Sequence, residues 1–213
     1  MLEIRDLRAW YGAAQALFSV SLTVGRGELV VLQGLNGAGK STLLQAIMGL
    51  GPRIEGVISY QNESVLDLPT HQRALRGLGY VPEDRRLFTA LTVQQNLLIA
   101  ARPGTTSVIA ERQDQVLQLF PALKGMLMRS AAHMSGGEQQ MLSIARTLMT
   151  SPSMLLLDEP CEGIAPVLVE SIRDALLRLK AQGMSMLVAE QNGVLTARAD
   201  RVITLAAQTP LDA

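Results

Sequence analysis

The sequence predicts an α/β fold with a mostly parallel central sheet. Three short apolar runs support this prediction, because strands covered on both faces of a parallel sheet are apolar along most of their length. They are Leu29–Leu32, Met154–Leu157 and Ser185–Ala189. Strands alternate with helical patterns in the second half of the chain, and this order implies parallel pairing with right-handed crossovers.

The first thirty residues show a different pattern, in which apolar and polar residues alternate. Leu2, Ile4 and Leu7, and then Val20, Leu22 and Val24, recur at a spacing of two or nearly two. This spacing predicts half-buried antiparallel strands beside the parallel core. Further strands are predicted at Gly56–Tyr60, Leu78–Val81 and Arg201–Leu205.

The predicted helices lie between these strands. They begin at Lys40, cover most of Val93–Phe120 with a break at Pro103-Gly104, follow Ser135, and occupy Val167–Ala181 and a short stretch at Gly193–Ala199. A chain of 213 residues is long enough for one domain with a substantial core. We therefore expect a single domain over residues 1–213, with an inserted helical lobe at about 84–150.

Composition argues against several classes of function. With 19 basic and 19 acidic residues the net charge is zero, so no overall field favours DNA, RNA or an anionic membrane. Aromatic residues make up 3%, too few for a platform that stacks single-stranded bases. No apolar run approaches the roughly 20 residues of a membrane span, and Met1–Arg5 does not resemble an export signal. We expect a soluble cytoplasmic protein, without an intrachain disulfide because Cys161 is its single cysteine.

A glycine-rich segment between the first apolar run and the first helix predicts a phosphate-binding loop, or P-loop. The segment reads Gly34-x-x-x-x-Gly39-Lys40-Ser41. Glycines let the backbone approach phosphates closely, the helix N-terminus favours an anion, the lysine would reach the β- and γ-phosphates, and the serine would ligate magnesium. The candidate phosphate-binding residues are Gly34, Asn36, Gly37, Ala38, Gly39, Lys40, Ser41 and Thr42. The alternative is a glycine-rich turn without a ligand.

A pair of acids follows the second apolar run. Asp158 and Glu159 come directly after Met154–Leu157, at the carboxyl end of a buried strand, where α/β sheets place their ligands. Asp158 would hold the metal, and Glu159 would orient and deprotonate the attacking water. Such a pair alone is more often an ordinary strand end, and the P-loop is what makes the catalytic interpretation strong.

The segment Ser135–Glu138 is a second candidate anion site. It combines a hydroxyl, two glycines and the start of a predicted helix. The alternative is a capping box, in which Ser135 caps the helix and Glu138 completes the reciprocal hydrogen bonds. Both can hold together, since capping and phosphate binding use the same geometry.

Taken together, these segments resemble the ATP-binding subunits of ABC transporters, from about Leu2 to Leu205. The residues that carry the resemblance are the P-loop, Ser135-Gly-Gly-Glu-Gln-Gln140 and Leu155-Leu-Leu-Asp-Glu-Pro160. Within that family, four segments resemble the high-affinity branched-chain amino-acid importer ATPases and their urea and short-amide relatives. These segments are Tyr80–Glu83, Ser135–Met141, Glu162–Pro166 and Ala189–Asn192.

The resemblance implies an ATPase subunit of an importer, with ATP and Mg²⁺ as ligands. Two such subunits, identical or paired with a similar second one, would sandwich two ATP molecules and drive transmembrane permease subunits, with an extracytoplasmic solute-binding protein as an indirect partner and no nucleic acid. The chain would then be peripheral at the cytoplasmic face of the inner membrane. Closure would act on the permease through the loop around Glu83 to Leu91.

Individual roles also follow from the resemblance. Tyr11 would stack on adenine; the alternative is a partly buried aromatic near Trp10. Ser135, Gly136, Gly137 and Glu138 would bind the γ-phosphate held by the other subunit. The loop Cys161–Pro166 would cross the interface between subunits.

Two positions depart from the usual family pattern. Glu83 stands where most members have glutamine, and Gln191 where most have histidine. Glu83 would reach phosphate only through magnesium or water, and Gln191, a candidate catalytic residue, can donate a hydrogen bond but cannot take up a proton at neutral pH.

The remaining candidates have weaker support. His71 and His133 lack the neighbouring ligands of a metal site, and Cys161 lacks a basic neighbour in sequence that would activate it. Arg85 and Arg86 could be exposed charges or contacts for a membrane partner.

Two rival classes remain. A soluble ABC ATPase acting on DNA or the ribosome would usually need two cassettes or a long coiled coil. A simple P-loop kinase or GTPase would leave Ser135–Glu138 unexplained.

Overall fold

A five-stranded parallel sheet forms the centre of the molecule, as predicted. The computed structural model describes residues 1–191 and 193–205; Asn192, at the end of the Ala189–Asn192 segment, and residues 206–213 of the predicted domain lie outside this range. The strand order is β6-β7-β8-β3-β9, and every neighbouring pair is parallel. The strands are β6 (Leu78–Val81), β7 (Met154–Asp158), β8 (Ser185–Glu190), β3 (Leu29–Gln33) and β9 (Arg201–Thr204).

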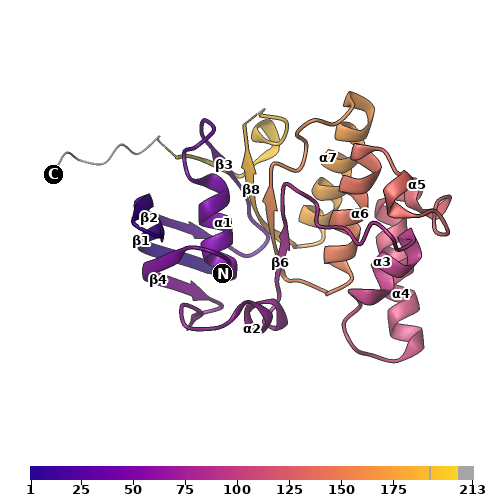
Figure 1. Cartoon of the computed structure of the whole chain (residues 1–213), viewed down its shortest axis with the longest axis horizontal. Helices are drawn as coiled ribbons and strands as arrows, with labels where there is room; N and C mark the ends of the chain where they lie inside the picture. Colours follow the sequence, from indigo (N-terminus) through magenta and orange to yellow (C-terminus); the bar gives the residue numbers. More distant parts are fainter. Residues whose placement is uncertain (192, 206–213) are drawn as a thin grey trace.

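An antiparallel sheet packs beside this core, which confirms the prediction from the N-terminal alternation. Its order is β2-β1-β4-β5, and its strands are β1 (Leu2–Tyr11), β2 (Ala14–Val24), β4 (Arg53–Tyr60) and β5 (Glu63–Ser64). Helix α1 (Lys40–Met48) contacts strands of both sheets. Figure 1 shows α1 on the side of the antiparallel sheet, with α3 to α7 gathered on the opposite side of the parallel sheet.

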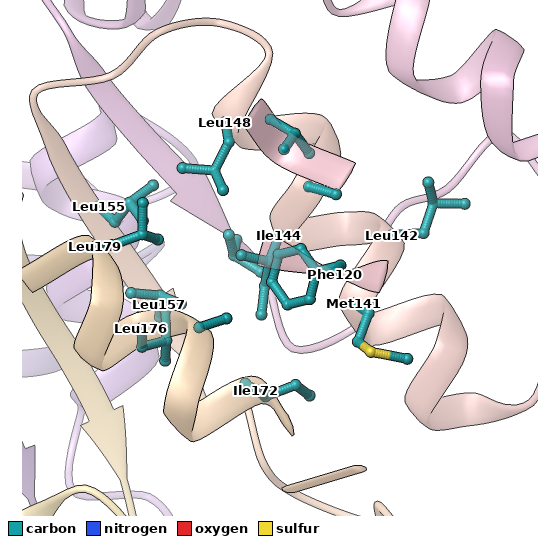
Figure 2. Packing of buried hydrophobic residues seen from close by; sticks show 14 of the residues in the cluster. Phe120, Met141, Leu142, Ile144, Leu148, Leu155, Leu157, Ile172, Leu176 and Leu179 are labelled. Carbon is teal, nitrogen blue, oxygen red and sulfur yellow. The ribbon is translucent and has the colours of Figure 1, made fainter. Parts of the chain in front are cut away.

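Side chains of the parallel strands point alternately into two separate cores. Leu29 and Val31 belong to the core under helices α6 (Gly136–Leu148) and α7 (Pro166–Ala181). Val30 and Leu32 belong to the core under α1 and the antiparallel sheet. Strand β7 divides in the same way, and Figure 2 shows Leu155 and Leu157 facing side chains of α6 and α7. Burial on both faces explains why these strands are apolar throughout.

Three helices between β6 and α6 extend the core under α6. They are α3 (Val93–Ile99), α4 (Thr106–Leu119) and α5 (Pro121–Lys124), followed by a 3-10 turn at Ala131–His133. The helical pattern stops after Ile99 and resumes at Thr106, so the predicted break at Pro103-Gly104 is confirmed. Among the helices within the described ranges, none combines the length and apolarity that crossing a bilayer requires.

Some short elements differ from the prediction. The helix expected at Gly193–Ala199 is only a 3-10 turn at Thr196–Arg198, because Gly193 has a left-handed φ of 70° that a helix does not accept. The prediction also lacked β5, helix α2 (Thr70–Leu75) and α5, which have two, six and four residues. Segments this short carry too few apolar residues to show a period.

Candidate nucleotide-binding site

The predicted P-loop joins the end of β3 to the start of α1. Gly37 and Gly39 have left-handed φ angles of 81° and 93°, which other residues adopt only at a cost. Gly39 is also the N-cap of α1, and no side chain caps that helix. The N–H groups of the first turn of α1 are therefore left for an anion placed at this end of the helix.

Lys40 and Glu159 form an ion pair beside the P-loop. The Nζ of Lys40 lies 3.1 Å from the Oε1 of Glu159, and the two side chains are 5% and 7% exposed. The same Nζ donates to the carbonyl oxygen of Gly34 at 2.8 Å and to that of Leu35 at 3.3 Å. An unpaired charge at this depth is costly, so the contact between the two side chains offsets part of the cost of burying them.

Ser41 and Asp158 contact each other next to the ion pair of Lys40 and Glu159. The Oγ of Ser41 donates to the Oδ1 of Asp158 at 2.9 Å, and the hydroxyl of Tyr80 donates to its Oδ2 at 3.2 Å. Burial raises the pKa of Asp158, and the charges of Glu83 and Glu159 raise it further, while the two hydrogen bonds lower it. A divalent cation at these oxygens would oppose the effect of burial and favour the carboxylate.

Glu159 is oriented by the backbone that follows β8. Its N–H donates to the carbonyl oxygen of Ala189 at 2.9 Å, and the N–H of Gln191 donates to its Oε2 at 3.1 Å. Glu159 itself has a left-handed φ of 44°, a strained backbone position of the kind that gathers at functional sites. The structure therefore brings Gln191 to the candidate base through its backbone, whereas its side chain is exposed.

A cavity of about 400 Å³ opens in front of these groups. Its lining includes eight of the predicted site residues, namely Asn36, Gly37, Gly39, Lys40, Ser41, Thr42, Glu83 and Glu159. A neighbouring cavity of about 300 Å³ shares Ser41 and Glu83 with it and adds Tyr80 and Asp158. Glu83 thus lies within the candidate site, whereas Gly34 and Ala38 line neither cavity.

The residues present fit a magnesium nucleotide. Mg²⁺ prefers hard oxygen ligands and usually takes one or two carboxylates together with substrate phosphates. Ser41 and Asp158 supply such oxygens at the edge of the cavity, next to an uncapped helix N-terminus. In the part of the chain that the structure covers, no three His, Cys, Asp or Glu residues form a cluster able to hold a metal by themselves.

The segment Ser135–Glu138 lies outside both cavities. It starts α6 and forms the predicted capping box, in which the N–H of Ser135 donates to Glu138 at 2.7 Å and the N–H of Glu138 donates to the Oγ of Ser135 at 3.4 Å. A Cβ at Gly137 would lie 2.4 Å from Leu168 of α7, so glycine lets the two helices pack closely. The capping interpretation therefore holds within one chain, and phosphate binding would need a ligand presented from outside it.

Tyr11 also lies outside the cavity lined by the P-loop. It is 45% exposed, and its hydroxyl donates to the Oε1 of Gln45 in α1 at 2.8 Å. Nearby, Arg53 lies over the ring of Trp10, 4.5 Å from its centroid. Adenine stacking on Tyr11 stays a prediction.

Sequence reasoning missed several residues of the site. Tyr80 and Gln45 line the second cavity, and Glu162 lines the first. A signal for Tyr80 was present, since it stands next to the end of a strand that pairs in parallel with β7, with Tyr80 opposite Leu156. Parallel pairing brings carboxyl ends together, so a polar residue there was a candidate partner for Asp158.

Comparison with known proteins identifies the family of this chain. Residues 17–162 match the ABC transporter family. The chain belongs to the ABC transporter family. This membership implies ATP binding and hydrolysis, and the P-loop cavity is where this ABC transporter chain offers the groups for both.

Two curated relatives and one solved structure show how broad the similarity is. The high-affinity branched-chain amino acid transport ATP-binding protein BraG of Pseudomonas aeruginosa is 42% identical over 90% of this ABC transporter chain and 82% of its own length. The lipopolysaccharide export system ATP-binding protein LptB of Escherichia coli is 34% identical over 90% and 80%. A nucleotide-free ATP-binding cassette from an ABC transporter superposes with a TM-score of 0.84 at 27% identity, covering 97% of this chain and 88% of the other.

Proposed function

We propose that this chain is the ATP-hydrolysing subunit of an importer for branched-chain amino acids or related small solutes. The observation that carries the ATPase role is the meeting of Lys40, Ser41, Asp158 and Glu159 at one buried corner beside the P-loop. The 42% identity to BraG supports the solute class. A urea or short-amide importer is the alternative, and a soluble non-transport ABC ATPase is a weaker one.

In this proposal the chain's own side chains exchange partners when ATP enters. The triphosphate competes with Glu159 for Lys40, so the ion pair opens and the glutamate is freed to accept a proton from water. The N–H of Gln191 continues to hold the Oε2 of Glu159 in place. Ser41 and Asp158 would hold Mg²⁺, with Glu83 reaching it through water, and the bound ion would supply positive charge against the phosphates.

The partner of the site is a second ATP-binding subunit, either a copy of this chain or a similar one. The segment Ser135–Glu138 supports this view, because it offers a helix N-terminus, a kind of site that favours anions, outside the lining of its own P-loop cavity. Each ATP would lie between one P-loop and the Ser135–Glu138 segment of the other subunit. Transmembrane permease subunits complete the importer, and an extracytoplasmic solute-binding protein acts through them. Contact with the permease holds this chain at the cytoplasmic face of the inner membrane.

The variant Glu159→Gln tests the catalytic assignment. It keeps the volume and one hydrogen-bond acceptor but removes the base, so we expect turnover to fall by at least roughly 10²-fold. Mg-ATP binding should persist, and an ATP-bound dimer should accumulate because the nucleotide is no longer consumed. Phosphate release and light scattering after gel filtration measure the two effects. Turnover at the parental rate would show that another group is the base.

The solute class needs a test in the cell. If the proposal holds, deleting this chain lowers the uptake of radiolabelled leucine, and expression of the parental chain restores it, whereas Glu159→Gln does not. Unchanged leucine uptake together with lost urea or short-amide uptake would favour the alternative.

A further inference from the structure

Arg85 extends from the loop after β6 to the start of α6. Its Nη1 donates to the Oε1 of Gln139 at 3.1 Å, and a Cβ on Gly136 would lie 3.2 Å from its Nη2. The sequence left Arg85 and Arg86 equally open as exposed charges or permease contacts. The structure separates them, since Arg86 turns outward to an ion pair with Asp84 at 3.1 Å, whereas Arg85 packs on the Ser135–Glu138 segment.

The loop that carries Arg85 is fixed to α6 along its backbone. The carbonyl oxygen of Arg85 accepts from the Oγ of Ser143 at 3.0 Å and from the Nη2 of Arg146 at 3.2 Å. The next carbonyl oxygen, of Arg86, accepts from the Nη1 of Arg146 at 2.7 Å. These contacts hold Arg85 and Arg86 at left-handed φ angles of 60° and 46°. The loop backbone is therefore fixed against α6, and the hydrogen bond to Gln139 places the guanidinium at the start of that helix.

The charges at this helix end do not balance. A helix N-terminus carries partial positive charge and is stabilised by anions, yet here it meets the guanidinium of Arg85. Arg129 adds a second cation, 4.0 Å from Glu138, and Glu138 is the one acid in the first turn of α6. Arg85 forms no ion pair with any carboxylate of residues 1–191 or 193–205, and its Nε is buried without a hydrogen-bond partner there.

We propose that Arg85 is a phosphate-binding residue of the trans half-site, where its positive charge helps α6 to hold the triphosphate bound by the partner subunit. The inference rests on the proposed sandwich of two subunits and adds to it a residue that acts only when the subunits meet. It also links Glu83, two residues before Arg85 and inside the P-loop cavity of the same chain, to the half-site that serves the partner's nucleotide.

The test measures ATP-dependent dimerisation in the Glu159→Gln background, which keeps nucleotide intact. Adding Arg85→Gln should weaken the dimer by roughly tenfold for each of its two sites, where a factor of ten corresponds to about 1.4 kcal/mol. The affinity of the monomer for Mg-ADP should not change, because Arg85 lies outside the P-loop cavity, and the thermal midpoint should fall only slightly, because the variant loses the hydrogen bond to Gln139. The matched control is Arg5→Gln, which removes one exposed arginine paired with Glu3 in β1 and should leave the dimer intact.

Arg85→Lys separates charge from shape. A lysine loses the fork that contacts Gln139 but keeps the positive charge. Because the proposal depends on that charge, we expect Arg85→Lys to restore most of the dimerisation. Dimerisation by Arg85→Gln at the parental ATP concentration would overturn the inference, because it would show that the charge of Arg85 is not needed. A lysine variant as weak as the glutamine one would also overturn it, because that result points to a packing role. If Glu159→Gln with Arg85 intact forms no dimer, the sandwich itself is wrong and the inference falls with it.

Discussion

Glu190, the last residue of β8, is a carboxyl group that its surroundings disfavour as an anion. It is 1% exposed, and its Oε2 accepts the N–H of Leu195 at 2.9 Å, while its Oε1 is buried without a partner in the described ranges. Burial raises the pKa of Glu190 above its ordinary value, the charge of Glu159 raises it further, and the hydrogen bond from Leu195 lowers it. The folded state therefore binds this proton more tightly than the unfolded state.

The contribution of Glu190 to the free energy of unfolding should consequently fall as the pH rises. The folded pKa lies above the ordinary value of 4.5, so this contribution is complete below that pH and is lost as the pH rises through the raised folded pKa. Glu190→Gln keeps an acceptor for Leu195 and cannot ionise. We expect the variant to gain stability relative to the parent as the pH is raised, measured by urea unfolding across a pH series. Parallel pH profiles for parent and variant would contradict the assignment.

Cys161 shows that a predicted lack of reactivity has a physical basis. It is buried, and burial raises the pKa of its thiol to about 12, with the charge of Glu190 adding to the effect. Such a thiol is almost wholly protonated at neutral pH, so the expectation from sequence that it is no nucleophile agrees with its surroundings. The absence of basic neighbours is visible in the sequence, whereas the burial of the thiol is visible only in the folded structure.

The same division applies to the site residues. The P-loop could be located from sequence because its residues are contiguous and its geometry is local. Tyr80 and Arg85 could not be assigned, because their partners Asp158 and Gln139 lie 78 and 54 positions away and are reached only through strand pairing and helix packing. Gln191 was predicted as a site residue through its side chain, but the group that contacts Glu159 is its backbone N–H.

At the scale of elements, the end of α1 depends on an arginine from another helix. Arg73 of α2 is 2% exposed. Its Nη1 donates to the carbonyl oxygens of Ala46 and Ile47 at 2.9 and 2.7 Å, and its Nε and Nη2 donate to Leu68 and Leu66 at 2.8 and 2.7 Å. One guanidinium thus satisfies carbonyl groups at the end of the helix that carries the P-loop, which such helix ends otherwise leave unpaired.

Replacing Arg73 should therefore destabilise the fold. Arg73→Met keeps much of the apolar stem but removes the donor of four hydrogen bonds to carbonyl oxygens, of which those to Ala46 and Ile47 are buried, at a cost of about 3 kcal/mol. Chemical denaturation measures the change. The control is Arg76→Met, which removes a partly exposed arginine paired with Glu63 and should cost at most about 1 kcal/mol. Equal losses for the two variants would show that the contacts of Arg73 are not special.

Elements that span a whole layer were easier to predict than elements that connect layers. β3, β7 and β8 are apolar because both faces are covered, and that pattern is visible in a single sequence. Helix α2 exists largely because it brings Arg73 to α1, a contact 26 residues away that no local period records. Its six residues form no clear apolar face. Local sequence therefore does not predict this helix, and tertiary packing is what stabilises it.

At the scale of the whole molecule, the P-loop cavity and the Ser135–Glu138 segment occupy separate places on one chain. If each ATP is held by both, the two halves of a site come from different protomers, and defects in different halves should complement each other. Lys40→Ala removes the P-loop lysine. Ser135→Asp keeps a good N-cap for α6 but places a negative charge where the partner's phosphates would lie.

Neither variant alone should hydrolyse ATP, because both sites of each symmetric dimer carry a defect. In an equal mixture, half of the dimers are mixed, and each mixed dimer has one site with an intact P-loop and an intact Ser135. We expect about a quarter of the parental rate per protomer if the two sites act independently. Phosphate release during titration of one variant into the other measures this recovery. A rate equal to the average of the two variants alone would mean that each site is complete within one chain, and the sandwich would have to be abandoned.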